Sequence, residues 1–324
     1  MSQPITLRRI YQARGTIAPY AVRTPLVRSD ALSDMSGRDI FLKLETAQVT
    51  GAFKIRGAAN RLCNLTPAAQ ARGVVTVSTG NHGRAVAQVG RALGIRVVVC
   101  VPELVLPHKV AAMAKLGAEI VVAGANQDEA EAHAADLAAR EGLTMVSPFD
   151  DPDVIAGQGT IGLEILEDLP AVDTVVAPLS GGGLLGGIAL AVKTADPDIR
   201  VVGVSMAKSP VMVESVKAGH VVQLPEEPTL ADSLMGGIGL DNRHSFELIR
   251  RLVDEYVLLS EEEIATAMRF AFLTERQIVE GGGAVALGAV LHQKIATLGA
   301  TVVVVLSGRN VDTDKLLTIV GAGQ

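Results

Sequence analysis

The chain has little cysteine and no excess of basic residues, and both shortages exclude classes of protein. Its 324 residues include two cysteines, Cys63 and Cys100, which are not spaced like zinc ligands or a disulfide framework. The formal net charge is −6, from 29 basic and 35 acidic residues, so no basic surface for a nucleic acid is expected. We therefore expect free thiols in a reducing cytoplasm and no nucleic-acid partner.

An export signal and a membrane span are also lacking in the sequence. Arg8, Arg9 and Arg14 interrupt the stretch that would form the apolar core of a signal peptide. Residues 174–192 carry no charge, but they contain a proline, a serine and five glycines, which is typical of a strand, a loop and a helix. We therefore expect a cytoplasmic protein with no membrane partner.

Apolar residues are abundant, at 48% of the chain, so a large core can form. From residue 73 onward, β-branched runs alternate with alanine-rich helical patterns, which indicates βαβ units around parallel sheets. One set of predicted strands lies at 74–78, 96–102 and 119–124, and a second set lies at 39–45, 173–179, 199–205 and 301–307.

These patterns predict an α/β protein with two doubly wound open-sheet domains. The small domain is expected at residues 73–148, inserted into a large domain formed by 1–72 and 149–324. Residues 222–240 have two prolines, three glycines and no clear periodicity, and we interpret them as a functional loop or as a plain surface connection.

A glycine-rich loop follows the predicted strand at 173–179. It reads Ser180-Gly181-Gly182-Gly183-Leu184 and leads into a helix, whose free N–H groups and dipole favour a phosphate. The spacing also satisfies a dinucleotide fingerprint, but the strand that follows ends at Ser205 without the required carboxylate. A bound phosphate group is the favoured interpretation.

Two further segments carry reactive or polar side chains at predicted helix starts. Lys54 lies in TGAFKIRGA, where the helix dipole and apolar neighbours disfavour its charged form, so it is a candidate nucleophilic amine. Alone, this lysine would more simply be a surface residue. The segment STGNHG offers backbone donors, hydroxyls, an amide and an imidazole, which suit a carboxylate.

Five ordered motifs, TGAFKIRGA, STGNHG, VIAGQGTIGLEIL, LSGGGLLGG and VVLSGRNVD, together resemble one enzyme family over nearly the whole chain. They are similar to those of the fold-type-II (tryptophan synthase β-like) pyridoxal-phosphate enzymes, in the branch of threonine and serine dehydratases and serine racemase. This resemblance implies pyridoxal 5′-phosphate as the cofactor and a homodimer as the assembly. LSGGGLLGG and LADSLMGGIG look more like the subgroup of hydroxyectoine utilisation.

The resemblance implies a role for each matching residue. Lys54 would bind the cofactor aldehyde and remove the substrate Cα proton, and Thr79 would be the second candidate for acid or base catalysis. Ser307 would face the pyridine nitrogen, and Ser180 would add a hydroxyl donor to the phosphate loop. The implied cofactor-binding residues are Phe53, Lys54, Asn81, Ser180, Gly181, Gly182, Gly183, Leu184 and Ser307, and the implied substrate-carboxylate residues are Ser78, Thr79, Gly80 and His82.

Several positions depart from the racemase pattern. Ser205 and Val211 stand where that pattern has metal-binding acids, so no metal site is expected. Phe149 replaces an asparagine, and Thr79 replaces the serine that acts in racemisation. The helix that carries a substrate-binding arginine in the racemase here begins with Asp128, Glu129 and Glu131, so we expect a second carboxylate on the substrate to be repelled.

These observations predict a pyridoxal-phosphate-dependent dehydratase, an ammonia-lyase of threonine or serine type. It would eliminate water from a small-molecule substrate, a β-hydroxy-α-amino acid, and give a 2-oxo acid and ammonia. An amino-acid racemase and a non-catalytic ligand sensor on the same fold remain as alternatives.

Overall fold

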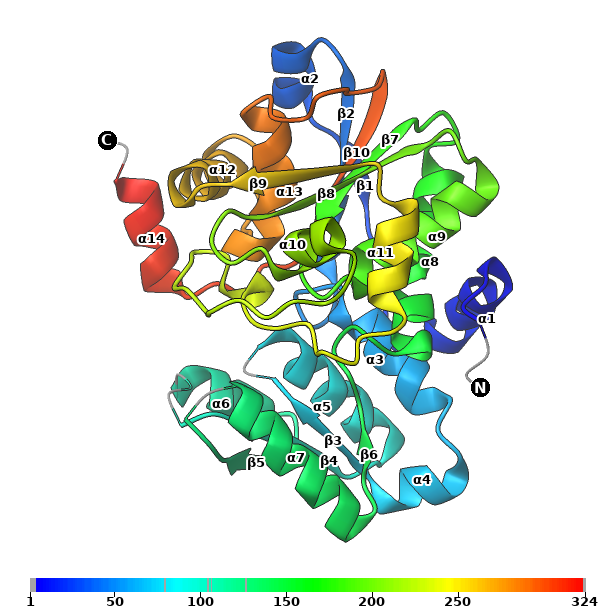
Figure 1. The fold of residues 1–324 in the computed structure, drawn as a ribbon. Coiled ribbons are helices and arrows are strands. Elements are labelled where there is room, and N and C mark those ends of the chain that lie inside the picture. Colours follow the sequence, from blue (N-terminus) through cyan, green and yellow to red (C-terminus); the bar gives the residue numbers. More distant parts are fainter. Residues whose placement is uncertain (1–3, 79, 104, 106, 126, 323–324) are drawn as a thin grey trace.

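The computed structural model describes residues 4–78, 80–103, 105, 107–125 and 127–322. Its strands form two separate sheets, which lie one above the other with helices on their faces (Figure 1). None of the helices among these described residues is long and apolar enough to cross a membrane.

The larger sheet has six strands in the order β1-β2-β10-β7-β8-β9. All neighbours are parallel except β1, which pairs antiparallel with β2. In chain order its strands are β1 (Leu26–Arg28), β2 (Asp39–Leu44), β7 (Thr174–Pro178), β8 (Arg200–Met206), β9 (Glu255–Leu259) and β10 (Thr301–Leu306).

Helices cover both faces of this sheet. Three of them are α8 (Pro152–Asp168), α9 (Gly183–Ala195) and α13 (Gly281–Leu291); the others are α1 (Leu7–Ile17), α2 (Asp30–Ser36), α10 (Val211–Ala218), α11 (Ser245–Leu252), α12 (Glu261–Leu273) and α14 (Thr313–Gly321). Short 3₁₀ turns lie at η1 (Glu45–Ala47) and η2 (Asp232–Leu234).

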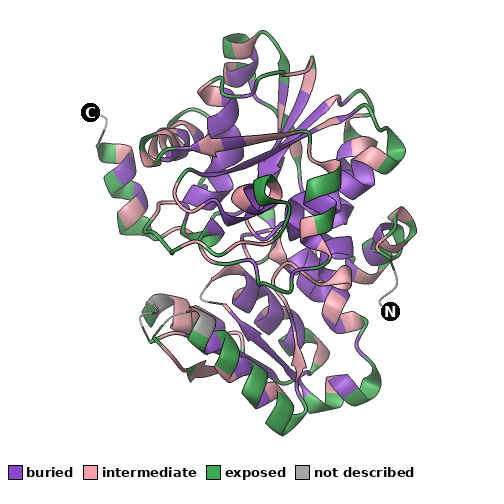
Figure 2. Ribbon diagram, viewed as in Figure 1, coloured by how far each residue is buried: buried purple, intermediate pink, exposed green. Residues whose placement is uncertain are grey.

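Side-chain alternation along each strand explains why both faces are buried. In β10, Val302 and Val304 pack toward α12 and α13, whereas Val303 and Val305 pack toward α8 and α9. A strand between two helix layers must be apolar at every position, which is the reason for the run TVVVVL. The buried residues accordingly fill the sheet and the helix faces turned toward it (Figure 2).

The smaller sheet is parallel throughout, with the order β5-β4-β3-β6. Its strands are β3 (Val74–Val77), β4 (Val97–Val101), β5 (Glu119–Val122) and β6 (Thr144–Met145), and its connecting helices are α5 (Asn81–Leu93), α6 (Pro107–Ala114) and α7 (Gln127–Glu141). α7 packs on one face, and α3 (Lys54–Cys63), α4 (Pro67–Arg72) and α5 pack on the other.

The structure confirms the predicted fold class and contains each of the strands that the sequence predicts. It adds β1, β6 and β9. β1 and β6 have three and two residues, which is too short for a periodic pattern, whereas β9 is the five-residue run EYVLL, which the sequence reasoning missed. Residues 73–148 do contain the smaller sheet, but α3 and α4, which precede residue 73, also pack in its core. The domain boundaries given above remain a prediction.

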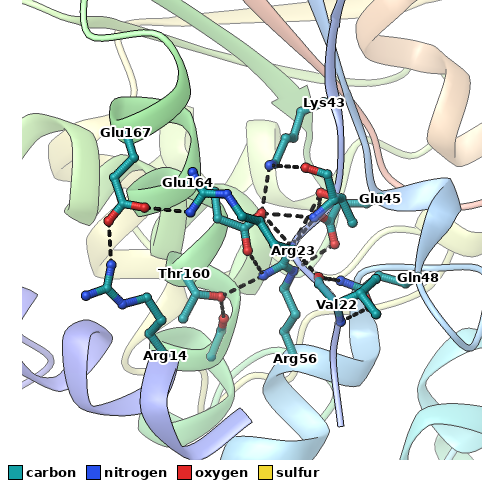
Figure 3. A network of polar contacts seen from close by, with 12 residues as sticks. Arg14, Val22, Arg23, Lys43, Glu45, Gln48, Arg56, Thr160, Glu164 and Glu167 are labelled. Carbon is teal, nitrogen blue, oxygen red and sulfur yellow. Dashed lines mark hydrogen bonds and ion pairs between the residues drawn. The ribbon is translucent and has the colours of Figure 1, made fainter. Parts of the chain in front are cut away.

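A buried network of charges joins α3 to the larger sheet (Figure 3). Arg56 on α3 donates to both carboxylate oxygens of Glu45, at 2.9 and 2.8 Å, and to both oxygens of Glu164 on α8, at 2.6 and 3.0 Å. Lys43 on β2 lies 2.7 Å from Glu164 and donates to the carbonyl oxygen of Thr24 at 2.7 Å. Both cations are almost wholly buried.

Within this network, the charges of Arg56 and Lys43 offset the desolvation of Glu164. Burial alone would raise the pKa of Glu164, but the hydrogen bonds and charges of Arg56 and Lys43 outweigh it and lower that pKa. A buried ion pair of this kind need not add stability relative to apolar residues, yet removal of one partner leaves an uncompensated charge. The relative positions of α3, α8 and β2 therefore depend on all of its members.

We predict that Arg56→Met lowers the free energy of unfolding by about 3 to 5 kcal/mol, because Glu45 and Glu164 lose their shared cation. Denaturant unfolding followed by circular dichroism measures the change. The control is Arg28→Met, since Arg28 pairs with Asp30 and Asp39 while 43% exposed, and its loss should change the free energy of unfolding much less. Equal losses in the two variants would contradict the importance of the buried network.

Candidate functional site

A large cavity lies between the carboxyl ends of the two sheets, where ligands bind in open α/β folds. Its volume is about 870 Å³. The structure brings together every predicted site residue that it describes, and these lining residues are Phe53, Lys54, Ser78, Gly80, Asn81, His82, Ser180, Gly181, Gly182, Gly183, Leu184 and Ser307. Thr79 lies outside the described residues.

Lys54 begins α3 and reaches into this cavity. Its Nζ donates to the carbonyl oxygen of Pro148 at 2.7 Å and lies 5.2 Å from the centre of the Phe53 ring. Burial lowers the pKa of Lys54 to about 8, against a smaller opposing effect of Glu280. The uncharged, nucleophilic fraction of the amine near neutral pH is therefore larger than for an ordinary lysine.

The glycine loop forms the cradle that the sequence predicts. Gly182 has a φ of +84°, which L side chains rarely adopt, and α9 begins at the next residue. A Cβ on Gly181 would lie 2.3 Å from the ring of Phe149, so this ring packs directly against the loop. The first backbone N–H groups of α9 have no partner within the helix and are available to a phosphate.

Ser180 differs from its predicted role. Its hydroxyl donates to the carbonyl oxygen of Leu234 at 2.9 Å, so this hydrogen is already used. The bond instead ties the glycine loop to the segment around η2, and residues 232–237 of that segment line the cavity. The segment at 222–240, which the sequence leaves open between a functional loop and a surface connection, thus contributes a wall of the site.

Asn81 is held in one orientation by two partners. Its Nδ2 donates to Glu280 Oε1 at 2.6 Å, and its Oδ1 accepts from Asn310 Nδ2 at 2.6 Å. Asn310 Nδ2 also lies 2.9 Å from the carbonyl oxygen of Thr50. An amide has two N–H groups, so the second N–H of Asn81 remains as a donor for a group in the cavity.

Glu280 is a site residue that the sequence reasoning missed. It is buried just before α13, lines the cavity, and has its pKa raised to about 7, first by burial and then by the charge of Asp232. Hydrogen bonds from Asn81 and Ser233 partly oppose this rise. The only sequence signal is an acid directly before three glycines, and its contact with Asn81 joins residues 199 positions apart.

His82 is buried, and its ring is hydrogen-bonded to the backbone of Val146. Nε2 lies 3.2 Å from the carbonyl oxygen of Val146, which can only accept, so Nε2 must carry the hydrogen. Burial and the charge of Lys54 lower the pKa of His82 to about 3, so Nδ1 is an acceptor without a partner among the described residues. The backbone N–H of His82 is the donor of this residue that suits a carboxylate, and its role in substrate binding stays a prediction.

The described acids of α7 do not line the cavity. Among its described lining residues only Gln127 contributes, and Glu129 accepts from the backbone N–H of Ala125 at 2.8 Å. The side chain of Asp128 is not described. Neither Glu129 nor Glu131 lines the cavity, so the geometry does not support the expected repulsion of a second carboxylate by these two residues.

Acidic ligands are missing where the racemase pattern has its metal. Ser205 and Val211 are both buried, and the Ser205 hydroxyl lies 3.6 Å from the sulfur of Met206. No group of three or more histidine, cysteine, aspartate or glutamate residues suitable for a metal occurs in the described part of the chain. The expectation of a metal-free enzyme remains a prediction.

Comparisons with known proteins decide the family. A model of pyridoxal-phosphate dependent enzymes matches residues 17–308. The chain belongs to this family. It is 48% identical to a putative threonine dehydratase of Sinorhizobium fredii, covering 95% of this chain and 93% of that protein. It is 40% identical to the L-threonine ammonia-lyase of Thermotoga maritima, covering 98% of this chain and 79% of that protein.

Solved structures agree with these relatives. Maize serine racemase superimposes with a TM-score of 0.92 at 33% identity, covering 98% of this chain and 97% of that structure. The predicted fold-type-II architecture, the pyridoxal-phosphate cofactor and the class of pyridoxal-phosphate-dependent ammonia-lyases are thereby confirmed.

The residues of this chain fit the cofactor. A buried lysine with a lowered pKa suits the aldehyde, and a glycine cradle at a helix N-terminus suits the phosphate. Both open into one cavity that also holds Asn81 and Ser307, which can bond to ring substituents. When bound, pyridoxal phosphate supplies an electron sink for the charge that develops at the substrate Cα.

We predict that Glu280 makes the stability of the cofactor-free protein pH-dependent. Its pKa is near 7 when folded and near 4.5 when unfolded, so the folded state holds the extra proton between these values and stability falls as pH rises through this range. Glu280→Gln keeps an acceptor for Asn81 but removes the titration. The melting temperature of Glu280→Gln minus that of the wild type should therefore be larger at pH 8 than at pH 5.

The matched control is Glu214→Gln on the exposed side of α10, where Glu214 pairs only with Lys217. The melting temperature of this variant minus that of the wild type should be nearly the same at pH 5 and at pH 8. A Glu280→Gln difference that is the same at pH 5 and pH 8 would show that Glu280 ionises normally in the folded protein.

Proposed function

We propose that the chain deaminates a β-hydroxy-α-amino acid of the threonine and serine type, using Lys54 as the group that moves the Cα proton. The main support for this proposal is that the Lys54 amine is buried, has a lowered pKa, and lies in the same cavity as the glycine cradle. Two relatives named as threonine dehydratase or L-threonine ammonia-lyase support the reaction type.

The chemistry of each residue in the cavity suggests its role in binding the substrate or the cofactor. The backbone N–H groups of residues 80–82, with the Ser78 hydroxyl, would bind the α-carboxylate and place the Cα hydrogen toward Lys54. The Asn81 amide, fixed by Glu280 and Asn310, would bind the ring oxygen, and Ser307 would face the ring nitrogen. A hydroxyl cannot hold that nitrogen protonated as an acid would, which favours elimination over transamination.

The reaction is balanced without an oxidant. Lys54 takes the Cα proton, the β-hydroxyl leaves as water, and the released unsaturated amine takes up water to give a 2-oxo acid and ammonia. Threonine thus gives 2-oxobutanoate, and serine gives pyruvate. Larger neutral hydroxy amino acids, such as those derived from hydroxyectoine, are included in the proposal because of the resemblance of the glycine-loop segments.

The predicted roles of Phe53, Thr79 and the residues 180–184 belong to the same proposal. Phe53 would pack beside the pyridine ring, and Gly181, Gly182, Gly183 and Leu184 would hold the phosphate through backbone N–H groups. A cytoplasmic location is also proposed, and it is consistent with Cys63 and Cys100, which are both free thiols.

We predict that the purified protein is yellow and releases ammonia and a 2-oxo acid from threonine or serine. Lys54→Ala should reduce turnover at least about a hundredfold, because the proton-transfer group is lost. Borohydride reduction of the wild type followed by peptide mapping should place the cofactor on Lys54. Lys217→Ala, at a lysine whose side chain is 62% exposed, is the control and should retain full activity.

Other products would favour the alternative functions. Interconversion of enantiomers without ammonia would indicate a racemase, and a bound cofactor without turnover of any hydroxy amino acid would indicate a ligand sensor. Cofactor attached to a lysine other than Lys54 would contradict the proposed role of this residue.

We also propose a homodimer, as the family resemblance implies. Apolar side chains are exposed at the end of α12, just after it and on α14, with Leu273 43%, Ile278 46% and Leu317 57% exposed. Ile278 and Leu317 also line the cavity, and exposed apolar side chains of this kind are candidates for an interface.

Light scattering should therefore give twice the chain mass of 33.7 kDa at micromolar concentration. Leu317→Glu should shift the protein toward the monomer, because a charge would be buried in the contact. A single-chain mass for the wild type would contradict the proposal.

A further inference from the structure

The cavity lining contains cationic side chains that the proposed binding of pyridoxal phosphate and an α-carboxylate does not use, together with the acids Asp232, Glu280 and Asp312. Besides Lys54, its lining includes three cationic side chains, those of Arg84, Lys109 and Arg309. Lys109 is neutralised by Asp232, at 3.2 Å, and Arg309 is exposed at the outer rim. Arg84 is half-buried, and it lies on the helix α5.

Arg84 is placed beside the substrate-carboxylate loop. It is the fourth residue of α5, and its backbone N–H bonds to the carbonyl oxygen of Gly80 at 3.2 Å. Helical side chains lean toward the N-terminus of their helix, so that of Arg84 leans toward the turn containing Gly80 and Asn81. Its guanidinium makes no hydrogen bond or ion pair with any residue that the structure describes.

An arginine in a cavity, without a protein partner, is suited to an oxyanion of the ligand. The guanidinium presents a planar fork of donors that matches a carboxylate at two points. The glycine cradle on the other sheet accounts for the phosphate, and backbone N–H groups at the start of α5 account for the α-carboxylate. The charge of Arg84 is therefore left for a third anionic group.

We propose that Arg84 binds a second carboxylate of the substrate, so that this enzyme acts on hydroxy amino acids with an acidic side chain. The simplest member of this class is 3-hydroxyaspartate, which is threonine with its methyl group replaced by a carboxylate. Its elimination gives oxaloacetate and ammonia, with the same balance of water and protons as the reaction of threonine. The wall formed by α7 presents Gln127 and no described acid to such a group.

This inference rests on the proposed ammonia-lyase activity, so the test measures both substrates on each variant. In the wild type, kcat/KM for one diastereomer of 3-hydroxyaspartate should exceed that for threonine. Arg84→Gln should lower kcat/KM for 3-hydroxyaspartate roughly ten- to a hundredfold, the range expected for a lost charged hydrogen bond, and change that for threonine less than about threefold. For Arg84→Lys, kcat/KM for 3-hydroxyaspartate should lie between the values of the wild type and of Arg84→Gln, because lysine keeps the charge but lacks the planar pair of donors.

The matched control is Arg91→Gln. Arg91 is exposed near the end of the same helix, outside the cavity lining, so its loss changes the net charge equally. It should leave both substrates nearly unchanged. An equal effect of Arg91→Gln and Arg84→Gln would reduce the role of Arg84 to the overall field of the protein and would overturn the proposal.

A binding measurement separates this inference from the catalytic one. Malate and 3-hydroxybutyrate lack the amine, cannot react, and differ by the same exchange of a carboxylate for a methyl group. Calorimetry on the cofactor-loaded protein should show tighter binding of malate, and Arg84→Gln should abolish that preference. This result would support Arg84 even if no hydroxy amino acid were turned over.

Two outcomes would overturn the proposal. One is equal or weaker binding and turnover of the dicarboxylates by the wild type. The other is a large fall in pyridoxal-phosphate affinity in Arg84→Gln, measured by absorbance during titration of the cofactor-free protein, because this would assign Arg84 to the phosphate.

Discussion

The position of Lys54 depends on the buried charges of Arg56, two residues further along α3. Arg56 is bonded to Glu45, which follows β2, and to Glu164 on α8, so the first turn of α3 is fixed to the larger sheet at two points. The same helix packs with its apolar face on the smaller sheet. One ionic network thus sets where a reactive amine stands relative to the phosphate cradle, which the larger sheet carries.

Desolvation is the common cause of the unusual titration in the cavity. It lowers the pKa of Lys54 and His82 and raises that of Glu280, in each case favouring the uncharged form. The enclosed space between the two sheets therefore raises the uncharged fraction of the Lys54 amine. Among the other charged side chains that line the cavity, Lys109 on α6 and Asp232 in η2 form an ion pair at 3.2 Å.

Much of this arrangement follows from the sequence, because it depends on local pattern. The strand runs and the glycine loop before α9 are read from consecutive residues, and Lys54 and Asn81 belong to short motifs at helix starts. The partners that orient them are distant in the chain, and no local pattern reveals Glu280 against Asn81 or Asp232 against Lys109. The sequence also does not tell which side of α7 faces the cavity, and the structure leaves Glu129 and Glu131 out of its lining.

The connections of the smaller sheet have a mechanical consequence. The chain enters this sheet at β3 and leaves it after β6, and these two strands are neighbours, with Val74 opposite Thr144. Both attachments therefore lie at one edge, whereas β5 and α6 lie toward the opposite edge (Figure 1). If the smaller sheet rotates about these attachments, the displacement of a residue grows with its distance from them. It is small at the loop after β3 and large at Lys109. The ends of the cavity would then open by unequal amounts, widely at the Lys109 rim and least where the α-carboxylate is expected.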